Sequence, residues 1–314
     1  METEPVLLMT SPPATAKDCH GAPGVGRHIS VPDYWALTKP EVNLLIVITA
    51  FAGFCLGRPT SSHPFPFLLL IHTMLGTLMV AGGTGTLNQY IERSFDAKMR
   101  RTARRPLAAG RIEPSTALWF GILLSCVGGV YLAVAVNTLA SLLAVLTLVS
   151  YLFLYTPLKR KTPLCTLVGA FPGAMPPLIG WAAASGRLSL EAWVLYAMLF
   201  LWQFPHFMAI AWMYREDYAR AGYLVLPLGE RRGSFAAWQS LVPPLALLPV
   251  SLVPTILGHA GSIYLMGALL LSSTFLYFGA RLALGRSNAI ARRLLFASIV
   301  YLPLVFVLMV LDKA

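Results

Sequence analysis

The chain consists of long stretches without charged side chains, separated by short segments in which Lys and Arg are concentrated. A helix needs about 20 apolar residues to cross the hydrocarbon core of a bilayer, and two of the stretches are each long enough for two crossings. The pattern predicts an all-α fold with nine membrane-spanning helices. Their predicted ranges are 41–57, 64–87, 116–136, 138–157, 163–185, 190–213, 236–256, 261–280 and 293–311.

The composition also indicates a polytopic membrane protein. Hydrophobic residues make up 57% of the chain and charged residues only 12%. A soluble domain usually carries about 25% charged residues. The composition therefore excludes a soluble globular protein.

The positions of the basic residues predict which side of the membrane each loop occupies. Cytoplasmic loops carry an excess of Lys and Arg. A cytoplasmic N-terminus places every Lys and Arg on that side except Arg58, Arg187 and Lys313. The net charge of +11 then follows from topology and from attraction to anionic lipid, and nucleic acid is not expected as a partner.

The first part of the chain differs in character from the rest. Residues 1–33 contain Pro12-Pro13 and several acids, which a transit peptide would lack, and they have no apolar signal-peptide core. They are predicted to form a disordered cytoplasmic tail. Residues 34–314 are predicted to form a single nine-helix intramembrane domain.

Three polar residues stand at the end of the second predicted span. Asn88, Glu92 and Asp96 are spaced four residues apart, so on a helix they stay on one face and drift by only about 80° over two turns. Polar residues at the end of a span are costly unless they are used. Their amide and carboxylate oxygens could hold a hard divalent cation.

A dense group of Arg follows in the segment 98–106, and Lys159-Arg160-Lys161 follows the fourth predicted span on the same side. Arg binds phosphate with a planar fork, and Lys binds it with a mobile point charge. A topology signal is the alternative interpretation of the second segment. A cation-binding face beside phosphate-binding groups at a membrane edge suits a diphosphate with a greasy tail, which favours intramembrane prenyl transfer.

A second acidic loop lies four helices further along the chain and contains Glu216, Asp217 and Glu230. Both acidic loops follow a span with polar residues in its last turns, and both run on to a Pro-Leu step. The pattern suggests a four-helix unit that occurs twice, with one more helix added. The two loops are then expected to face one another across the bundle and to form a shared anion pocket.

Two histidines lie within predicted spans. If the sixth span continued as one helix, His206 and Asp217 would share a stripe. His206 is then either a hydrogen-bonded core residue or a substrate contact, which includes ligation of a metal in a bound cofactor. His72 would lie roughly opposite the Asn88 face, and it is expected to pack between helices or face the headgroups. His206 is the favoured substrate contact.

The segment 169–181 is rich in Gly and Pro. Irregular backbone at membrane depth is tolerated where it lines a cavity, whereas small residues also let helices pack closely. The sequence leaves both interpretations open, a wall of a substrate chamber and a close helix contact.

A series of short elements in residues 34–311 carries a family resemblance. They are Thr38-Lys39-Pro40-Glu41, Asn88-x-x-x-Glu92-x-x-x-Asp96-x-x-Met99, Arg101-Thr102-x-x-Arg105-Pro106-Leu107, Tyr155-Thr156-x-Leu158-Lys159-Arg160-x-Thr162, Pro176-Pro177-x-Ile179-Gly180-Trp181, Trp202-Gln203-x-Pro205-His206-Phe207 and Tyr214-x-x-Asp217-Tyr218-x-x-Ala221-Gly222. The chain resembles the UbiA superfamily of intramembrane prenyltransferases, and more closely its haem-modifying branch. Two positions depart from the superfamily pattern. Glu92 stands where many relatives have Asp. Ala221, four residues after Asp217, stands where the superfamily's second acidic motif often has another Asp, which leaves the metal stoichiometry at Asp217 open.

The resemblance implies transfer of the farnesyl group of farnesyl diphosphate to the 2-vinyl group of haem b, with water completing haem O. It implies an enzyme of the bacterial inner membrane whose active-site loops face the cytoplasm, with a haem A synthase or cytochrome oxidase assembly factors as partners. The implied site residues are Asn88, Glu92, Asp96 and Asp217 for Mg²⁺, Arg101, Arg104, Arg105, Lys159 and Arg160 for the diphosphate, and Gln203, His206 and Tyr214 for haem. The four metal residues and Lys159 are the implied catalytic residues.

Two rival functions remain. A UbiA-type enzyme that prenylates an aromatic quinone precursor would share the Asn/Asp motifs but would not need Gln203 or His206. A transporter would place its acids near the bilayer midplane, where broken helices meet, whereas here they lie at one interface. The sequence does not determine the length of the prenyl chain, because that length depends on the depth of an apolar tunnel.

Overall fold

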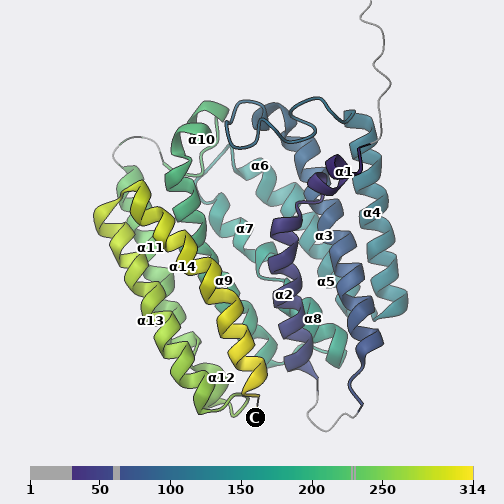
Figure 1. Cartoon of the computed structure of the whole chain (residues 1–314), viewed down its shortest axis with the longest axis vertical. Helices are drawn as coiled ribbons and strands as arrows, with labels where there is room; N and C mark the ends of the chain where they lie inside the picture. The colour runs from purple at the N-terminus through teal and green to yellow at the C-terminus, as the bar shows by residue number, and fades with distance from the viewer. Residues whose placement is uncertain (1–29, 59–63, 228, 230, 314) are drawn as a thin grey trace, which may run out of the picture. The chain divides into compact units, whose positions relative to one another are not determined.

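The computed structural model describes residues 30–58, 64–227, 229 and 231–313, and in these residues the regular secondary structure is helical (Figure 1). The helices are α1 (Val31–Leu37), α2 (Pro40–Gly57), α3 (Phe67–Asp96), α4 (Pro114–Ala135), α5 (Thr138–Val149), the π-helix η1 (Ser150–Tyr155), α6 (Thr156–Leu158), α7 (Cys165–Gly173), α8 (Pro176–Ser185), α9 (Leu190–Met213), α10 (Arg215–Ala221), α11 (Arg231–Val250), α12 (Val253–Ile256), α13 (Ser262–Gly285) and α14 (Asn288–Leu311). The predicted tail lies outside the described residues as far as residue 29, and its end belongs to α1.

The prediction of nine spans is confirmed within the described part of the chain, where nine helical segments are long and apolar enough to cross a membrane. Three of these segments are composite, namely α5–η1–α6, α7–α8 and α11–α12. The fourth span begins where the sequence predicts, because the Asn137 side chain accepts a hydrogen bond from the Ala140 backbone and caps α5. The Asn137 amide also donates to the Ala182 carbonyl, which ties this helix end to α8.

One boundary differs in a way that matters for the site. The second span was predicted to end at residue 87, but α3 continues to Asp96. Hydropathy ends the span early because it counts Asn88, Glu92 and Asp96 as polar. In the structure all three side chains are buried. The polar row therefore belongs to the regular part of the helix.

Helices that follow one another in sequence also pack against one another in both halves of the domain. In the first half α3 packs on α2 and α4, and α4 packs on α5; in the second half α9 packs on α7, α8 and α11, and α11 packs on α13. The first spans of the two halves, α2 and α8, pack together, and α14 covers α9, α13 and α2. This order is compatible with a four-helix unit that occurs twice with one added helix, and the repeat stays a prediction.

The Gly- and Pro-rich segment forms α7 and α8, with a break between Gly173 and Pro176. Gly180 of α8 lies directly against the backbone of Ala50 and Phe54 in α2, and Gly53 of α2 lies against the Pro177 carbonyl. Small residues on both helices thus allow their backbones to touch. These contacts support the interpretation of a close helix contact, and the chamber wall stays a prediction.

The opposite ends of the bundle carry different chemistry. The loops after α3, after α6 and around α10 lie together at one end, and the end of α14 lies at the other (Figure 1). There the Lys313 ammonium donates to the carbonyls of Cys55, Leu56 and Arg58, which satisfies the last carbonyls of α2. Burial lowers the pKa of Lys313.

The contact between α2 and α8 predicts a sharp difference between two glycine substitutions. A methyl group in Gly180→Ala would overlap the Ala50 carbonyl oxygen, whereas in Gly129→Ala it would lie 3.4 Å from a Val145 methyl, an ordinary contact. We expect Gly180→Ala to destabilise the domain by roughly 1–3 kcal/mol and Gly129→Ala to be neutral or slightly stabilising. Thermal unfolding of the detergent-solubilised protein measures both, and equal melting temperatures would contradict the close contact.

Candidate active site

The last turns of α3 carry a row of buried polar side chains. Asn88, Glu92 and Asp96 are 1%, 5% and 2% exposed, and their spacing keeps them on one face, as the sequence predicts. Buried carboxylates are stable only when they are paired and hydrogen-bonded. The partners of this row therefore define the site.

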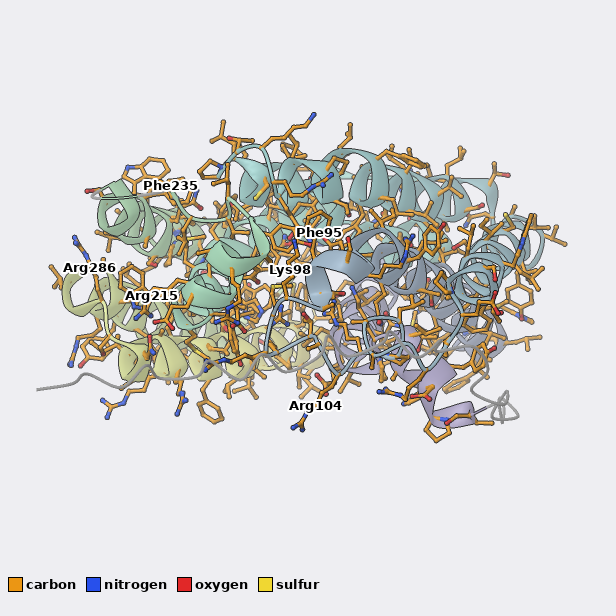
Figure 2. The ribbon with its side chains drawn as sticks, turned by 90° about the horizontal axis from the view of Figure 1, so that it is seen from above. Phe95, Lys98, Arg104, Arg215, Phe235 and Arg286 are labelled. Atoms are coloured by element: carbon orange, nitrogen blue, oxygen red, sulfur yellow. The ribbon has the colours of Figure 1, made fainter. Side chains whose placement is uncertain are left out.

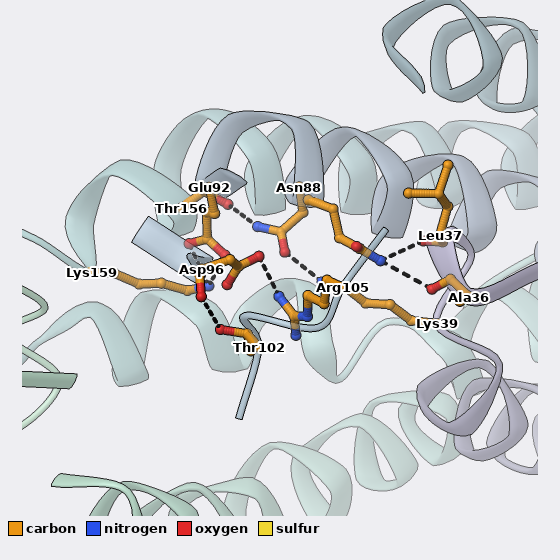
Figure 3. A network of polar contacts seen from close by, with 11 residues as sticks. Ala36, Leu37, Lys39, Asn88, Glu92, Asp96, Thr102, Arg105, Thr156 and Lys159 are labelled. Carbon is orange, nitrogen blue, oxygen red and sulfur yellow. Dashed lines mark hydrogen bonds and ion pairs between the residues drawn. The ribbon is translucent and has the colours of Figure 1, made fainter. Parts of the chain in front are cut away.

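Three basic side chains from three different segments cover the row (Figure 3). The pairs are Lys39 with Asn88, Lys159 with Glu92, and Arg105 with Asp96. The Lys159 Nζ atom lies 2.9 and 3.1 Å from the two carboxylate oxygens of Glu92. The Arg105 Nη1 atom lies 2.7 Å from Asp96 Oδ2. The segments concerned are the turn before α2, the end of α6 and the loop after α3.

Lys39 is a site residue that the sequence analysis did not single out. It has φ 55° and ψ 62°, a left-handed conformation that costs energy in a residue with a side chain, and it caps α2. The Gln89 amide donates to the carbonyls of Ala36 and Leu37, which fixes the end of α1 next to this turn. Burial, and next the nearby Arg105, lower the pKa of Lys39 to about 7. The motif Thr38-Lys39-Pro40-Glu41 is the feature of the sequence from which Lys39 could have been identified as a site residue.

Lys159 follows the π-helical stretch η1, and π-helical turns are frequent at functional sites. Thr156, the first residue after η1, accepts a hydrogen bond of 3.2 Å from the Asn88 amide. The Lys159 ammonium also lies 4.6 Å from the centre of the Tyr155 ring. Burial is the largest single influence on Lys159 and lowers its pKa, but the Glu92 carboxylate and the Tyr155 and Tyr151 side chains together raise the pKa well above the ordinary value.

The two acidic loops meet, as the sequence predicts. The Asp217 carboxylate of α10 accepts a hydrogen bond from the Arg101 backbone N–H, at 3.3 Å, and forms an ion pair with Arg220 at 2.9 Å. Arg220 also donates to the Lys98 carbonyl. Asp217 thus holds the loop that carries Arg105. Among the described residues, Asp217 forms no hydrogen bond or ion pair with Asn88, Glu92 or Asp96.

An apolar cluster beneath the loops joins the three segments at this end. Its buried members include Met99 after α3, Cys165 at the start of α7, Met208 in α9, and Tyr223 and Leu226 after α10. The Tyr223 hydroxyl is buried and interacts with the Glu92 carboxylate. Burial and then the neighbouring Glu92 carboxylate raise the pKa of Tyr223. Tyr223 was not predicted, because only its tertiary position reveals it.

The other predicted diphosphate residues lie at the same end but outside the three pairs. The Arg101 guanidinium lies 5.2 Å from the centre of the Tyr214 ring, and that of Arg160 lies 4.7 Å from the Phe95 ring. Arg104 is exposed, and Figure 2 shows its side chain pointing outward. Within the described part of the chain, its backbone carbonyl accepts a hydrogen bond from Arg111.

The predicted haem residues occupy α9 and the break that follows it. The condition for a stripe shared by His206 and Asp217, one continuous helix, is not met, because α9 ends at Met213, as the predicted span 190–213 does, and Tyr214 leaves the helical conformation, with φ −108° and ψ 22°. The Gln203 amide donates to the carbonyls of Ala170 and Leu199.

The two histidines within spans have different neighbours. His206 forms a hydrogen bond with Ser298 of α14. His72 instead bonds Tyr131 and packs between α3 and α4, as expected.

The donor set of the α3 row fits a hard divalent cation by its chemistry. One amide and two carboxylates present oxygens on one face, the ligand type that Mg²⁺ prefers. In the described residues, no group of three or more His, Cys, Asp or Glu side chains already forms a metal-binding cluster. A cation at this row would have to displace Lys39, Lys159 and Arg105 from the oxygens that they now contact.

Comparisons with known proteins agree on one family. The family model described as UbiA prenyltransferase family matches residues 46–300. A protein named protoheme IX farnesyltransferase from Solibacter usitatus is 52% identical over 287 residues, which cover 90% of this chain and 98% of that protein. One of the same name from Koribacter versatilis is 45% identical over 90% of this chain and 93% of that protein. A mitochondrial one from Arabidopsis thaliana is 38% identical over 89% of this chain and 64% of that protein.

Solved structures share the fold at low sequence identity. The structure of a digeranylgeranylglyceryl phosphate synthase is 19% identical in sequence and has a TM-score of 0.71. The match covers 90% of this chain and 97% of the synthase chain. A UbiA homologue from Archaeoglobus fulgidus, described as bound to GPP and Mg²⁺, is 16% identical, has a TM-score of 0.57, and matches 88% of this chain and 99% of its own.

The buried pair of Glu92 and Lys159 predicts strong coupling in stability. Either Glu92→Gln or Lys159→Met leaves a buried charge without its partner, which we expect to cost roughly 3–5 kcal/mol. The double variant should lose clearly less than the sum of the two. Denaturant unfolding in metal-free detergent measures the cycle. The exposed pair of Asp33 and Arg111 is the control, expected to couple by less than about 1 kcal/mol, and additive losses at Glu92 and Lys159 would refute the pairing.

The lowered pKa of Lys39 predicts unusual amine reactivity. Only a neutral amine reacts with acetic anhydride, so in metal-free protein Lys39 should acetylate with a pH midpoint of about 7. A lysine model peptide in the same tube titrates near 10.4. Mass spectrometry of short labelling pulses reads the midpoint, which is independent of how slowly the buried amine reacts. A midpoint above 9 would contradict the burial of this ammonium.

Proposed function

The chain belongs to the UbiA prenyltransferase family, and we propose that it transfers the farnesyl group of farnesyl diphosphate to the 2-vinyl group of haem b. Water adds to the haem side, and the products are haem O and diphosphate. The observation that carries this proposal is the close similarity, over most of the chain, to proteins named protoheme IX farnesyltransferase. The buried oxygen row of α3, faced by basic side chains from three segments, supplies the chemistry that such a reaction needs.

We assign Asn88, Glu92 and Asp96 to hold Mg²⁺, with Asp217 as the acid that the opposite loop contributes. The Mg²⁺-bound structure of the Archaeoglobus fulgidus homologue supports the use of a divalent cation in this fold. A bound Mg²⁺ would stabilise the charge that develops on the departing diphosphate. Asp217 lies in the loop contact opposite the row and would have to release Arg220 to serve as a ligand.

The basic residues of the site would exchange partners when substrate binds. Arg105 and Lys159 now neutralise Asp96 and Glu92. With a divalent cation on those carboxylates, the guanidinium and the ammonium become free to donate to diphosphate oxygens, which are negatively charged as well. Among the described residues Lys39 hydrogen-bonds to a neutral amide, so it would gain a direct anionic partner. Arg101 and Arg160 lie at the same end and would extend the anion site. The exposed Arg104 would serve as an outer contact.

The apolar surroundings of the site would protect an allylic cation from hydrolysis. The apolar cluster that includes Met99, Met208 and Tyr223 lies beneath the loops. Such side chains exclude water from the carbon that loses the diphosphate. Haem would bind on the α9 side, with His206, Gln203 and Tyr214 as its assigned contacts.

The distribution of basic residues supports an orientation with the site at the cytoplasmic face. We place the protein in the inner membrane of a bacterium, with the predicted tail, residues 1–33, in the cytoplasm. Product transfer to a haem A synthase or to cytochrome oxidase assembly factors belongs to the same proposal.

A reconstituted assay tests the proposal. The purified protein in lipid vesicles receives haem b, farnesyl diphosphate and Mg²⁺, and mass spectrometry detects haem O. We expect haem O with the parent protein and a loss of at least 100-fold with Asp96→Asn, because that variant removes a charged oxygen ligand. Asp33→Asn, which breaks an exposed ion pair at the same end, should retain activity. Farnesyl transfer only to a hydroxybenzoate or naphthoate acceptor would assign the protein to quinone synthesis instead.

A further inference from the structure

Ser298 of α14 joins two aromatic side chains of α9. Its side chain is fully buried. Its backbone carbonyl accepts a hydrogen bond of 2.9 Å from the Trp202 indole, and its hydroxyl oxygen lies 2.8 Å from Nδ1 of His206. The same hydroxyl oxygen lies 2.6 Å from the Leu295 carbonyl oxygen, one turn earlier in α14.

These distances determine which ring nitrogen of His206 carries the proton. A carbonyl oxygen can only accept, so the Ser298 hydroxyl must donate its single proton to Leu295. The hydroxyl can then only accept from His206, which requires a proton on Nδ1. A neutral imidazole has one N–H, so Nε2 keeps a free lone pair.

The environment favours the neutral ring. Among the described residues, no acidic side chain forms a recorded contact with His206, and an unpaired charge within a span is costly. Nε2 forms no hydrogen bond with the residues that the structure describes, and His206 is only half-buried. The lone pair is therefore available to a ligand.

Neighbouring rings hold the imidazole plane in one orientation. The Trp202 ring stacks on His206 at 4.8 Å with an interplanar angle of 24°, and Phe207 meets the ring edge-on at 5.8 Å. Ser298 thus fixes both the ring and the residue that stacks on it. A preset tautomer and a fixed ring plane are what an imidazole needs to ligate a metal, because such a histidine donates its other N–H to a fixed acceptor.

We propose that Ser298 is a positioning residue that keeps the proton of His206 on Nδ1 and so presents Nε2 as a ligand for the iron of haem b. This inference rests on the proposed function, in which haem is the acceptor substrate. It assigns Ser298, which no sequence motif indicated, a role that acts through His206.

The tautomer can be measured without haem. In protein labelled with ¹⁵N-histidine, the two ring nitrogens give distinct chemical shifts according to which one is protonated, and loss of signals in His206→Gln assigns them. We expect Nδ1 protonated and Nε2 unprotonated in the parent protein and in Ser298→Thr, which keeps the hydroxyl. A proton on Nε2 in the parent would overturn the proposal, whatever the protein does with haem.

A haem titration then tests the consequence. The Soret spectrum of the metal-free protein is followed as haem b is added to the parent, Ser298→Ala, Ser298→Thr and His206→Gln. Loss of an outer partner of a metal ligand typically weakens binding by about 10–100-fold. We expect that loss and an altered Soret band in Ser298→Ala, a larger loss in His206→Gln, and binding close to the parent in Ser298→Thr.

The control Ser272→Ala removes another buried hydroxyl from the contact between α13 and α14, with no recorded contact to His206. We expect it to bind haem like the parent, and an equal loss in this variant would show a merely structural effect and overturn the proposal. Unchanged haem binding in Ser298→Ala would overturn it too. If the reconstituted assay gives no haem O from the parent, the proposed function fails, and that result is separate from the tautomer.

Discussion

The burial of two carboxylates in the last turns of α3 is the constraint on which the rest of the site depends. An ionised carboxylate removed from water is tolerated only when cations and hydrogen bonds replace the solvent. Arg93 of the same helix does not serve, since it donates to the Tyr90 carbonyl and lies over that ring. The partners therefore come from other segments. Those segments can reach α3 only if they meet at one end of the bundle, so charge compensation and tertiary arrangement are a single condition.

This condition also explains how one set of residues could serve both the substrate-free and the substrate-bound protein. Without substrate, Lys159 and Arg105 neutralise the acids of α3, and the loops stay in place. Lys39 differs, because among the described residues its ammonium hydrogen-bonds to the neutral Asn88 side chain, and burial and next Arg105 lower its pKa to about 7. Its charge is the least compensated of the three. An added anion would stabilise Lys39 most, and an ammonium whose charge is poorly compensated by its protein neighbours suits a binding residue.

The sequence predicts what depends on local pattern. Apolar stretches locate the spans, and a spacing of four residues puts Asn88, Glu92 and Asp96 on one face. The same hydropathy ends α3 too early, because a local scale cannot know that polar side chains are buried by partners from elsewhere. Only the motif Thr38-Lys39-Pro40-Glu41 could have identified Lys39. Its positive charge alone is explained equally well by the excess of basic residues in cytoplasmic loops.

Tyr223 and Ser298 lie beyond what local pattern can predict, because a buried hydroxyl beside a carboxylate or an imidazole is a tertiary fact. The break at Tyr214 coincides with the predicted end of the sixth span at residue 213. Neither Gly nor Pro marks it, and α10 resumes one residue later.

The break after α9 has a consequence for where two large substrates would meet. His206 lies seven residues before the end of α9 at Met213, hence about 10 Å deeper than the loops. The diphosphate groups belong at the level of those loops, where Arg105 and Lys159 lie. Were His206 to hold the iron, the centre of the macrocycle would stay below that level, and only its edge would reach the carbon that leaves the diphosphate. The vinyl groups of haem are on the periphery of the macrocycle. A reaction at a peripheral vinyl group is therefore the one that this separation in depth favours, and a small aromatic acceptor would gain nothing from it.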